Sequence, residues 1–243
     1  MPLVRIGDVA LGEGLPKVIV PLTGRTVEEL AVQASQLSGH PLDVVEWRAD
    51  YLEASHPDSL VAAGRELRSM LPHRPVLFTF RTGAEGGCRP IEPDAYAALN
   101  IALIESGLVQ AVDVELALDA ADAAGLPVIG SSHDFAGTPN AAEIVRRLDA
   151  MADRGMAVGK IAVTPTTPED VLTLLAACRA ATQRRPDTPV IAISMGGLGL
   201  VSRLAGHVFG SCATFAMVGR PSAPGQIPVE QLQPMLRLIA DSL

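Results

Sequence analysis

The sequence predicts one α/β domain over residues 1–243, a (β/α)8 barrel that begins with a short N-terminal hairpin. Three observations carry this prediction. Eight short β-branched runs recur along the chain, and segments with helical spacing separate nearly every pair of them. A length of 243 residues is typical of one such barrel. No Gly/Ser linker or low-complexity tract marks a boundary between domains.

The predicted elements follow in order after a hairpin at residues 3–14, which we expect to close the bottom of the barrel. The strands cover residues 17–22, 43–49, 75–81, 111–117, 127–133, 157–163, 189–194 and 212–218. Helical segments between them include residues 26–37, 141–152 and 168–181. Eight such units favour a closed barrel over an open sheet. No G-x-G-x-x-G motif opens the first helix, so the dinucleotide-binding alternative loses its main support.

Local signals mark several helix ends. Thr26 with Glu29, and Thr167 with Asp170, have the spacing of a capping box. Pro234 lies inside the last helical pattern and predicts a kink or a restart of that helix.

Composition narrows the class of protein. The 19 Lys and Arg against 27 Asp and Glu give a formal charge of −8, which argues against a nucleic-acid-binding protein. No apolar run approaches the ~18 residues of a membrane span, and the N-terminus lacks the apolar core of a signal peptide. Three cysteines without CxxC spacing argue against a disulfide framework and a structural zinc site. We therefore expect a soluble cytoplasmic protein.

Charged residues occupy strand positions that should face the barrel interior. Glu46, Arg48 and Asp50 alternate with apolar residues, so they share one face of the second strand. The apolar face must meet the helices, which turns Glu46 and Arg48 inward; Asp50, nearest the loop, could simply be solvated. The polar groups that converge in this way from five strands are Glu46, Arg48, Arg81, Asp113, Glu115, His133 and Lys160.

Each group also has a purely structural interpretation. Arg48 with Glu46, or Arg81 with Asp113, could form an ordinary ion pair inside the barrel. His133 could be a hydrogen-bonded strand end. These alternatives stay open on the sequence alone.

Lys160 is harder to explain as structure. It is the only charged residue of the run 157–163, and lysine is almost never fully buried without a partner or a task. Desolvation and neighbouring cations would lower its pKa and make the free amine a nucleophile. The sequence therefore suggests a lysine that forms a Schiff base.

Seven stretches of the chain resemble the type I 3-dehydroquinate dehydratases, Schiff-base lyases of the shikimate pathway with a TIM-barrel fold. They are VEWRADYLE at 45–53, FTFRTGAEGG at 78–87, VDVEL at 112–116, SSHDFAGTP at 131–139, GKIAVTP at 159–165, SMGGLGLVSRL at 194–204 and FGSCATFAMVGRPSAPGQI at 209–227. The last stretch is the most specific of them.

The resemblance implies a role for each matching residue. Lys160 would form the imine, His133 would be the general acid and base, and Glu85 would hold that pair in its working protonation state. Substrate contacts would come from Glu46, Arg48, Arg81, Arg203, Ser222 and Gln226. Supporting roles would fall to Asp50, Asp113, Met195 and Phe215. Residues 220–226 resemble the family's mobile flap, whereas Gly196, Gly197, Leu198 and Ser132 depart from its usual pattern.

The implied reaction removes water from 3-dehydroquinate to give 3-dehydroshikimate, a step toward the aromatic amino acids. The covalent imine would supply the electrophile, so no cofactor and no metal are expected. The resemblance also implies that the chain could form a homodimer, which no sequence patch indicates. Two alternatives remain: another Schiff-base barrel of the aldolase type, and a non-catalytic barrel that acts as a binding module.

Overall fold

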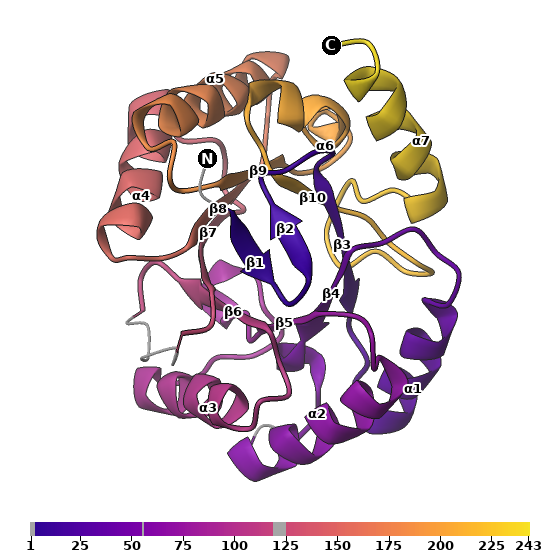
Figure 1. The fold of residues 1–243 in the computed structure, drawn as a ribbon. Helices are drawn as coiled ribbons and strands as arrows, with labels where there is room; N and C mark the ends of the chain where they lie inside the picture. The colour runs from indigo at the N-terminus through magenta and orange to yellow at the C-terminus, as the bar shows by residue number, and fades with distance from the viewer. Residues whose placement is uncertain (1–2, 55, 119–124) are drawn as a thin grey trace.

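The computed structural model describes residues 3–54, 56–118 and 125–243 (Figure 1). Eight parallel strands form a ring in the order β10-β3-β4-β5-β6-β7-β8-β9. Their bounds are β3 Lys17–Leu22, β4 Val44–Arg48, β5 Val76–Thr79, β6 Ala111–Glu115, β7 Val128–Asp134, β8 Val158–Val163, β9 Val190–Ser194 and β10 Ala213–Phe215. Each strand falls on one of the predicted runs, and only β7 extends one residue beyond its run. The predicted barrel is therefore confirmed.

The ring is nearly closed. β10 pairs in parallel with β3 over three residues, whereas on the β9 side there is an isolated bridge between Val190 of β9 and Ser211, which precedes β10. The backbone N–H of Cys212 donates to the carbonyl of Val190 at 2.8 Å.

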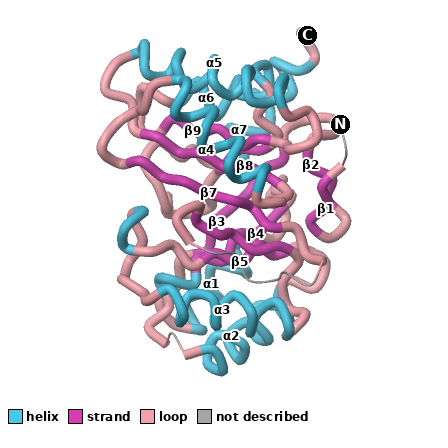
Figure 2. The backbone as a smooth tube through the Cα atoms, turned by 90° about the vertical axis from the view of Figure 1, so that its left-hand side faces the viewer, coloured by secondary structure: helices cyan, strands magenta, loops and turns pink. Residues whose placement is uncertain are grey.

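Helices surround the barrel (Figures 1 and 2). They are α1 Val27–Gln36, α2 Pro57–Met70, α3 Pro93–Glu105, α4 Ala141–Asp153, α5 Pro168–Arg184, α6 Leu200–Ala205 and α7 Val229–Ala240, with 3-10 turns η1 Ala49–Tyr51, η2 Gly83–Glu85 and η3 Gly206–Phe209. No helix in the described part of the chain is long and apolar enough to cross a membrane.

The predicted helix signals are confirmed in part. Thr167 and Asp170 form a complete capping box. Thr26 accepts from the backbone N–H of Glu29, but the Glu29 carboxylate accepts from the N–H of Arg25 instead. Of the kink or restart predicted at Pro234, the restart is wrong, because α7 is continuous through that residue, and the kink stays a prediction.

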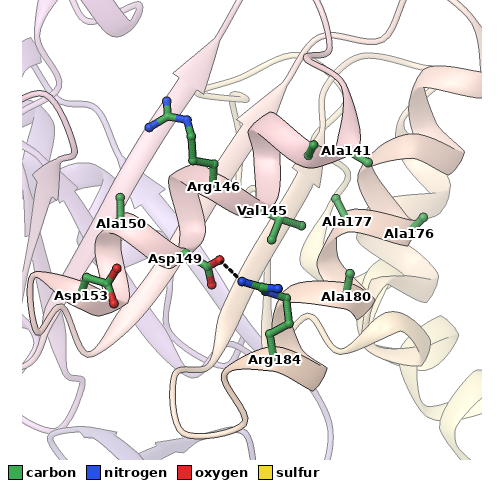
Figure 3. Close-up of a pocket in the computed structure, with 11 residues that line it drawn as sticks. Ala141, Val145, Arg146, Asp149, Ala150, Asp153, Ala176, Ala177, Ala180 and Arg184 are labelled. Atoms are coloured by element: carbon green, nitrogen blue, oxygen red, sulfur yellow. Dashed lines mark hydrogen bonds and ion pairs between the residues drawn. The ribbon is translucent and has the colours of Figure 1, made fainter.

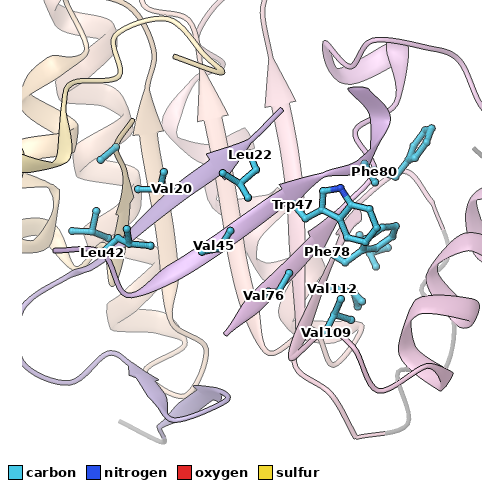
Figure 4. Packing of buried hydrophobic residues seen from close by; sticks show 14 of the residues in the cluster. Val20, Leu22, Leu42, Val45, Trp47, Val76, Phe78, Phe80, Val109 and Val112 are labelled. Carbon is cyan, nitrogen blue, oxygen red and sulfur yellow. The ribbon is translucent and has the colours of Figure 1, made fainter. Parts of the chain in front are cut away.

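Two apolar cores hold the fold together. The outer core packs the outward face of the strands against the helices, and its Trp47 and Phe78 rings meet edge to face at 5.5 Å (Figure 4). The inner core fills the barrel between β1 Val4–Ile6 and β2 Val9–Leu11 and the first residues of the strands. Ile6 and Leu11 of this hairpin are fully buried. The hairpin therefore closes the N-terminal end, as predicted, and leaves the C-terminal ends of the strands for a site.

Candidate functional site

A cavity of about 110 Å³ lies at the C-terminal ends of the barrel strands. Of the thirteen predicted site residues, eleven line it: Glu46, Arg48, Arg81, Glu85, His133, Lys160, Met195, Arg203, Phe215, Ser222 and Gln226. The other two, Asp50 and Asp113, are fully buried beside residues that line it. Parallel barrel strands bring residues from distant parts of a chain to one end, which is why these side chains meet.

The strand β4 places its charges as the alternation predicts. Glu46 and Arg48 line the cavity, whereas Val45 and Trp47 belong to the outer core. Arg48 does not pair with Glu46; its guanidinium donates to both carboxylate oxygens of Asp50 at 2.7 and 2.8 Å. Asp50 is 0% exposed, so the suggestion that it is merely solvated is wrong.

Lys160 reaches the cavity from the middle of β8 and is only 5% exposed. Its Nζ lies 3.1 Å from Oδ2 of Asp113 and 3.6 Å from Oε1 of Glu46. The Phe215 ring centroid is 4.7 Å from the same atom. The sequence led us to expect desolvation together with neighbouring cations around this amine; it is buried, but the groups that contact it are two carboxylates and an aromatic ring. Lys160 is therefore ion-paired with Asp113 and Glu46 inside the barrel.

Arg81 is the centre of a buried ion-pair network. Its guanidinium donates to Asp113 at 2.8 Å and to Glu115 at 3.0 Å, and it lies 3.5 Å from Glu85. Burial alone would raise the pKa of Asp113, but Arg81 and Lys160 hold that pKa below its ordinary value. Arg81 lines the cavity as predicted, yet its donors are largely engaged by protein carboxylates.

His133 and Glu85 form a hydrogen-bonded pair at the edge of the cavity. One carboxylate oxygen of Glu85 lies 2.8 Å from the imidazole Nδ1 and accepts the backbone N–H of His133 at 3.0 Å. Burial, together with Arg81, Lys160 and Arg48, lowers the pKa of His133 well below 6.5. Burial also raises the pKa of Glu85 to about 7, although Arg81 opposes that rise. The lowered pKa favours an uncharged imidazole at neutral pH, and Nε2 is the ring nitrogen that Glu85 does not contact.

Arg203 differs from the other buried cations because it has no carboxylate partner among the described residues. It is 2% exposed, and it donates to the carbonyls of Pro224 at 2.9 Å and Phe215 at 3.4 Å. Its Nε has no hydrogen-bond partner there. Burial lowers the pKa of Arg203 to about 10. An unpaired buried guanidinium is a strong attractor for an anionic ligand.

Residues 220–226, which resemble a flap, pack on the loop after β9. Within this segment, Ser222 donates its N–H to the Gln226 side chain at 2.8 Å. The carbonyl of Pro224 accepts the N–H of Gly196 at 3.1 Å. Gly196 has φ 73°, and a Cβ on Gly225 would come within 2.4 Å of the Gly196 carbonyl oxygen. The departure at Gly196 therefore lies where the flap and the β9 loop make their closest backbone approach.

Two neighbours of the site carried little signal in the sequence. Phe135 lines the cavity and packs so closely on Gly86 that a Cβ there would lie 2.3 Å from its ring. Phe135 lies in a loop, where no hydrophobic periodicity of the sequence could predict this contact. Glu115 was predicted to point inward, but nothing in the pattern assigned it a role. Ser132, another departure, accepts from Arg147 at 3.3 Å.

A second hollow lies outside the barrel between α4 and α5 (Figure 3). Alanine side chains from both helices form most of its lining, and Arg184 pairs with Asp149 beside it at 2.9 Å. It holds none of the predicted site residues. We therefore place the functional site in the barrel cavity.

Comparisons with known proteins identify relatives of this chain. A family model described as Type I 3-dehydroquinase matches residues 18–242. The chain is 42% identical to a 3-dehydroquinate dehydratase of Escherichia coli O17:K52:H18, with 98% of this chain and 99% of that protein covered.

Two solved structures have the same fold. A type I 3-dehydroquinate dehydratase from Clostridium difficile, with covalently modified comenic acid, superposes with a TM-score of 0.95 at 38% identity and covers 100% of this chain and 99% of its own. A 3-dehydroquinate dehydratase from Geobacillus kaustophilus gives a TM-score of 0.92 at 31% identity, with 99% and 97% covered.

Proposed function

The chain belongs to the type I 3-dehydroquinase family, and from that premise we propose that Lys160 and His133 carry out its reaction. The protein is a hydro-lyase that removes water from 3-dehydroquinate to give 3-dehydroshikimate in the shikimate pathway. Family membership decides against the aldolase-type and non-catalytic alternatives. The observation that carries the residue assignment is a buried lysine amine in the same cavity as an uncharged histidine.

Lys160 would supply the electron sink. Its amine attacks the substrate ketone, and loss of one water converts the adduct into an imine between Nζ and the former carbonyl carbon. The ammonium proton must leave first, and the carboxylate of Glu46 lies 3.6 Å from Nζ to receive it, whereas Asp113, whose pKa is held low by Arg81 and Lys160, stays ionised. A protonated imine accepts the electron pair of the neighbouring C–H bond far better than a ketone does.

His133 would then move the proton. Its uncharged imidazole takes the hydrogen from the carbon next to the imine, which leaves an enamine. The imidazolium that results returns the proton to the departing hydroxyl, so that water leaves and the C=C bond forms. Glu85 at Nδ1 stabilises the imidazolium between these two steps. Hydrolysis of the remaining imine frees the product and Lys160.

Arg203 and Gln226 would hold the substrate carboxylate. A guanidinium presents paired donors in the plane of a carboxylate, and Arg203 is the buried cation that lacks such a partner among the described residues. Glu46 and Arg48 would contact the ring hydroxyls. Holding the ring at both ends fixes it over Lys160.

Arg203→Gln is expected to raise KM for 3-dehydroquinate about 10- to 100-fold, because a charge-assisted hydrogen bond contributes about 1.5–3 kcal/mol. Steady-state kinetics checks this. The KM of Arg203→Lys should lie between the KM values of Arg203→Gln and the wild type. Arg237→Gln, on the exposed face of α7, serves as the matched control. An unchanged KM in Arg203→Gln would place the carboxylate elsewhere.

Borohydride reduction tests the proposal directly. Protein treated with 3-dehydroquinate and borohydride should gain the mass of one reduced adduct, and peptide mapping should find it on Lys160. Borohydride without substrate is the control. An adduct on another lysine, or none while the enzyme turns over, would contradict the role given to Lys160.

Three further assignments are part of this proposal. Residues 1–243 would act as one catalytic domain, and the protein would work in the cytoplasm. The free thiols of Cys88, Cys178 and Cys212 favour a reducing compartment. A homodimer is proposed from family resemblance, and sedimentation velocity distinguishes it from a monomer of 25.4 kDa.

A further inference from the structure

Glu115 is a buried carboxylate to which the reaction gives no role. It ends β6, is 2% exposed, and does not line the substrate cavity. Its Oε1 accepts the backbone N–H of Thr82 at 2.8 Å and Nη1 of Arg81 at 3.0 Å. Its Oε2 accepts the hydroxyl of Thr82 at 2.7 Å. A charge this deeply buried is costly, and among the described residues the hydrogen bonds of this carboxylate go to two adjacent residues, Arg81 and Thr82.

Thr82 is the start of the turn that carries Glu85. Its carbonyl accepts the N–H of Glu85 at 3.1 Å and the N–H of Gly87 at 2.8 Å. The turn η2 follows at once, and its last residue is Glu85, which binds the backbone and the ring of His133. A displacement of Thr82 would therefore move the carboxylate that holds the imidazole.

Arg81 connects the same carboxylate to Glu85 electrostatically. The guanidinium lies 3.0 Å from Glu115, 2.8 Å from Asp113 and 3.5 Å from Glu85. The groups that face Glu85 are thus Arg81 from the end of β5, His133 from β7, and Asp113 and Glu115 from β6. Lys160 from β8 and Arg48 from β4 also act on the histidine.

We propose that Glu115 is a positioning residue for the acid–base pair. It anchors Thr82, so that Glu85 reaches His133, and it engages Arg81, whose charge would otherwise act more strongly on Glu85. The inference rests on the proposed function, because it assumes that His133 transfers the proton.

The electrostatic part predicts a direction. Glu85 must be ionised to stabilise the imidazolium, so the acid limb of kcat/KM follows its pKa of about 7. Glu115→Gln keeps the shape of the side chain and removes its charge. Arg81 then acts more strongly on Glu85, the pKa of Glu85 falls, and the acid limb moves to lower pH by about 0.5 to 1 unit.

Two matched variants separate charge from anchoring. Thr82→Val removes the hydroxyl bond and leaves every charge in place, so kcat should fall about 3- to 10-fold with an unmoved acid limb. Glu115→Asp keeps the charge but shortens the side chain by one methylene, so it should behave like Thr82→Val. Borohydride labelling of Lys160 should persist in all three variants, because imine formation precedes proton transfer.

The measurement is the pH profile of kcat/KM, with the melting temperature and the borohydride label as checks on folding. A folded Glu115→Gln whose acid limb stays at the wild-type position would overturn the proposal and leave Glu115 a structural residue. If Glu115→Gln does not fold, Glu115→Asp carries the test, and wild-type kcat in that variant overturns the proposal. Absence of the borohydride label on Lys160 in the wild type would instead contradict the proposed function itself.

Discussion

Lys160→Ala should abolish the dehydration of 3-dehydroquinate and the borohydride adduct together. Without the amine no imine forms, and the substrate keeps a ketone that accepts the electron pair of a neighbouring C–H bond poorly. We expect kcat to fall by at least about 10⁴-fold, since the whole covalent route is lost. Turnover by absorbance of the enone product, with intact-protein mass after borohydride treatment, measures both effects.

Folding of this variant needs its own control, because Lys160 also pairs with Asp113 and Glu46. Removing one partner of a buried ion pair leaves the other charge uncompensated and is destabilising. Asp113 retains Arg81 at 2.8 Å, which limits that cost. Lys160→Arg keeps a positive charge in place but has no amine that forms an imine. Appreciable turnover in a folded Lys160→Arg would refute covalent catalysis at this position.

The position of Lys160 could be predicted from sequence, but its surroundings could not. One charge in an apolar run of strand-forming residues indicates burial inside the fold. Its partners come from β4 and β6, 114 and 47 residues earlier in the chain. Such contacts depend on the register between neighbouring strands, and the alternation of polar and apolar residues along one strand gives no information about that register.

The pairing of Arg48 shows the same limit at shorter range. Alternation placed Arg48, Glu46 and Asp50 on one face, so either carboxylate could have been its partner. The chain enters the turn η1 directly after β4, and this brings both oxygens of Asp50 onto the guanidinium. Side-chain direction was predictable, whereas the choice of partner required the backbone of the turn.

The flap region could be located only by resemblance. Gly196 and Gly225 lie in two separate loops, where no hydrophobic periodicity indicates which residues come into contact. A Cβ on Gly225 would lie 2.4 Å from the carbonyl oxygen of Gly196, so Gly225 has no room for a larger side chain, whereas a Cβ on Gly196 would meet nothing within 4 Å. The carbonyl oxygen of Pro224 accepts hydrogen bonds from both the backbone N–H of Gly196 and the guanidinium of Arg203. The position of the flap and the position of the proposed carboxylate-binding guanidinium are therefore physically coupled.

His133→Ala is expected to slow the reaction about 10²- to 10⁴-fold while imine formation continues, since that is the range for loss of a general acid–base group. Lys160 remains in place, so the substrate still condenses with it. The imine then accumulates, because no remaining side chain transfers the proton efficiently. In rapid mixing followed by borohydride, the labelled fraction should therefore exceed that of the wild type, in which the imine passes on to product.

His207→Ala is the matched control for this result. His207 lies in η3, outside the substrate cavity, so its removal should alter neither the labelled fraction nor kcat in a folded protein. Loss of the label in His133→Ala would mean that the imidazole acts before or during condensation. Wild-type kcat in the same variant would mean that another group transfers the proton. Because Glu85 binds Nδ1 and leaves Nε2 toward the cavity, the geometry favours slow turnover with accumulated imine.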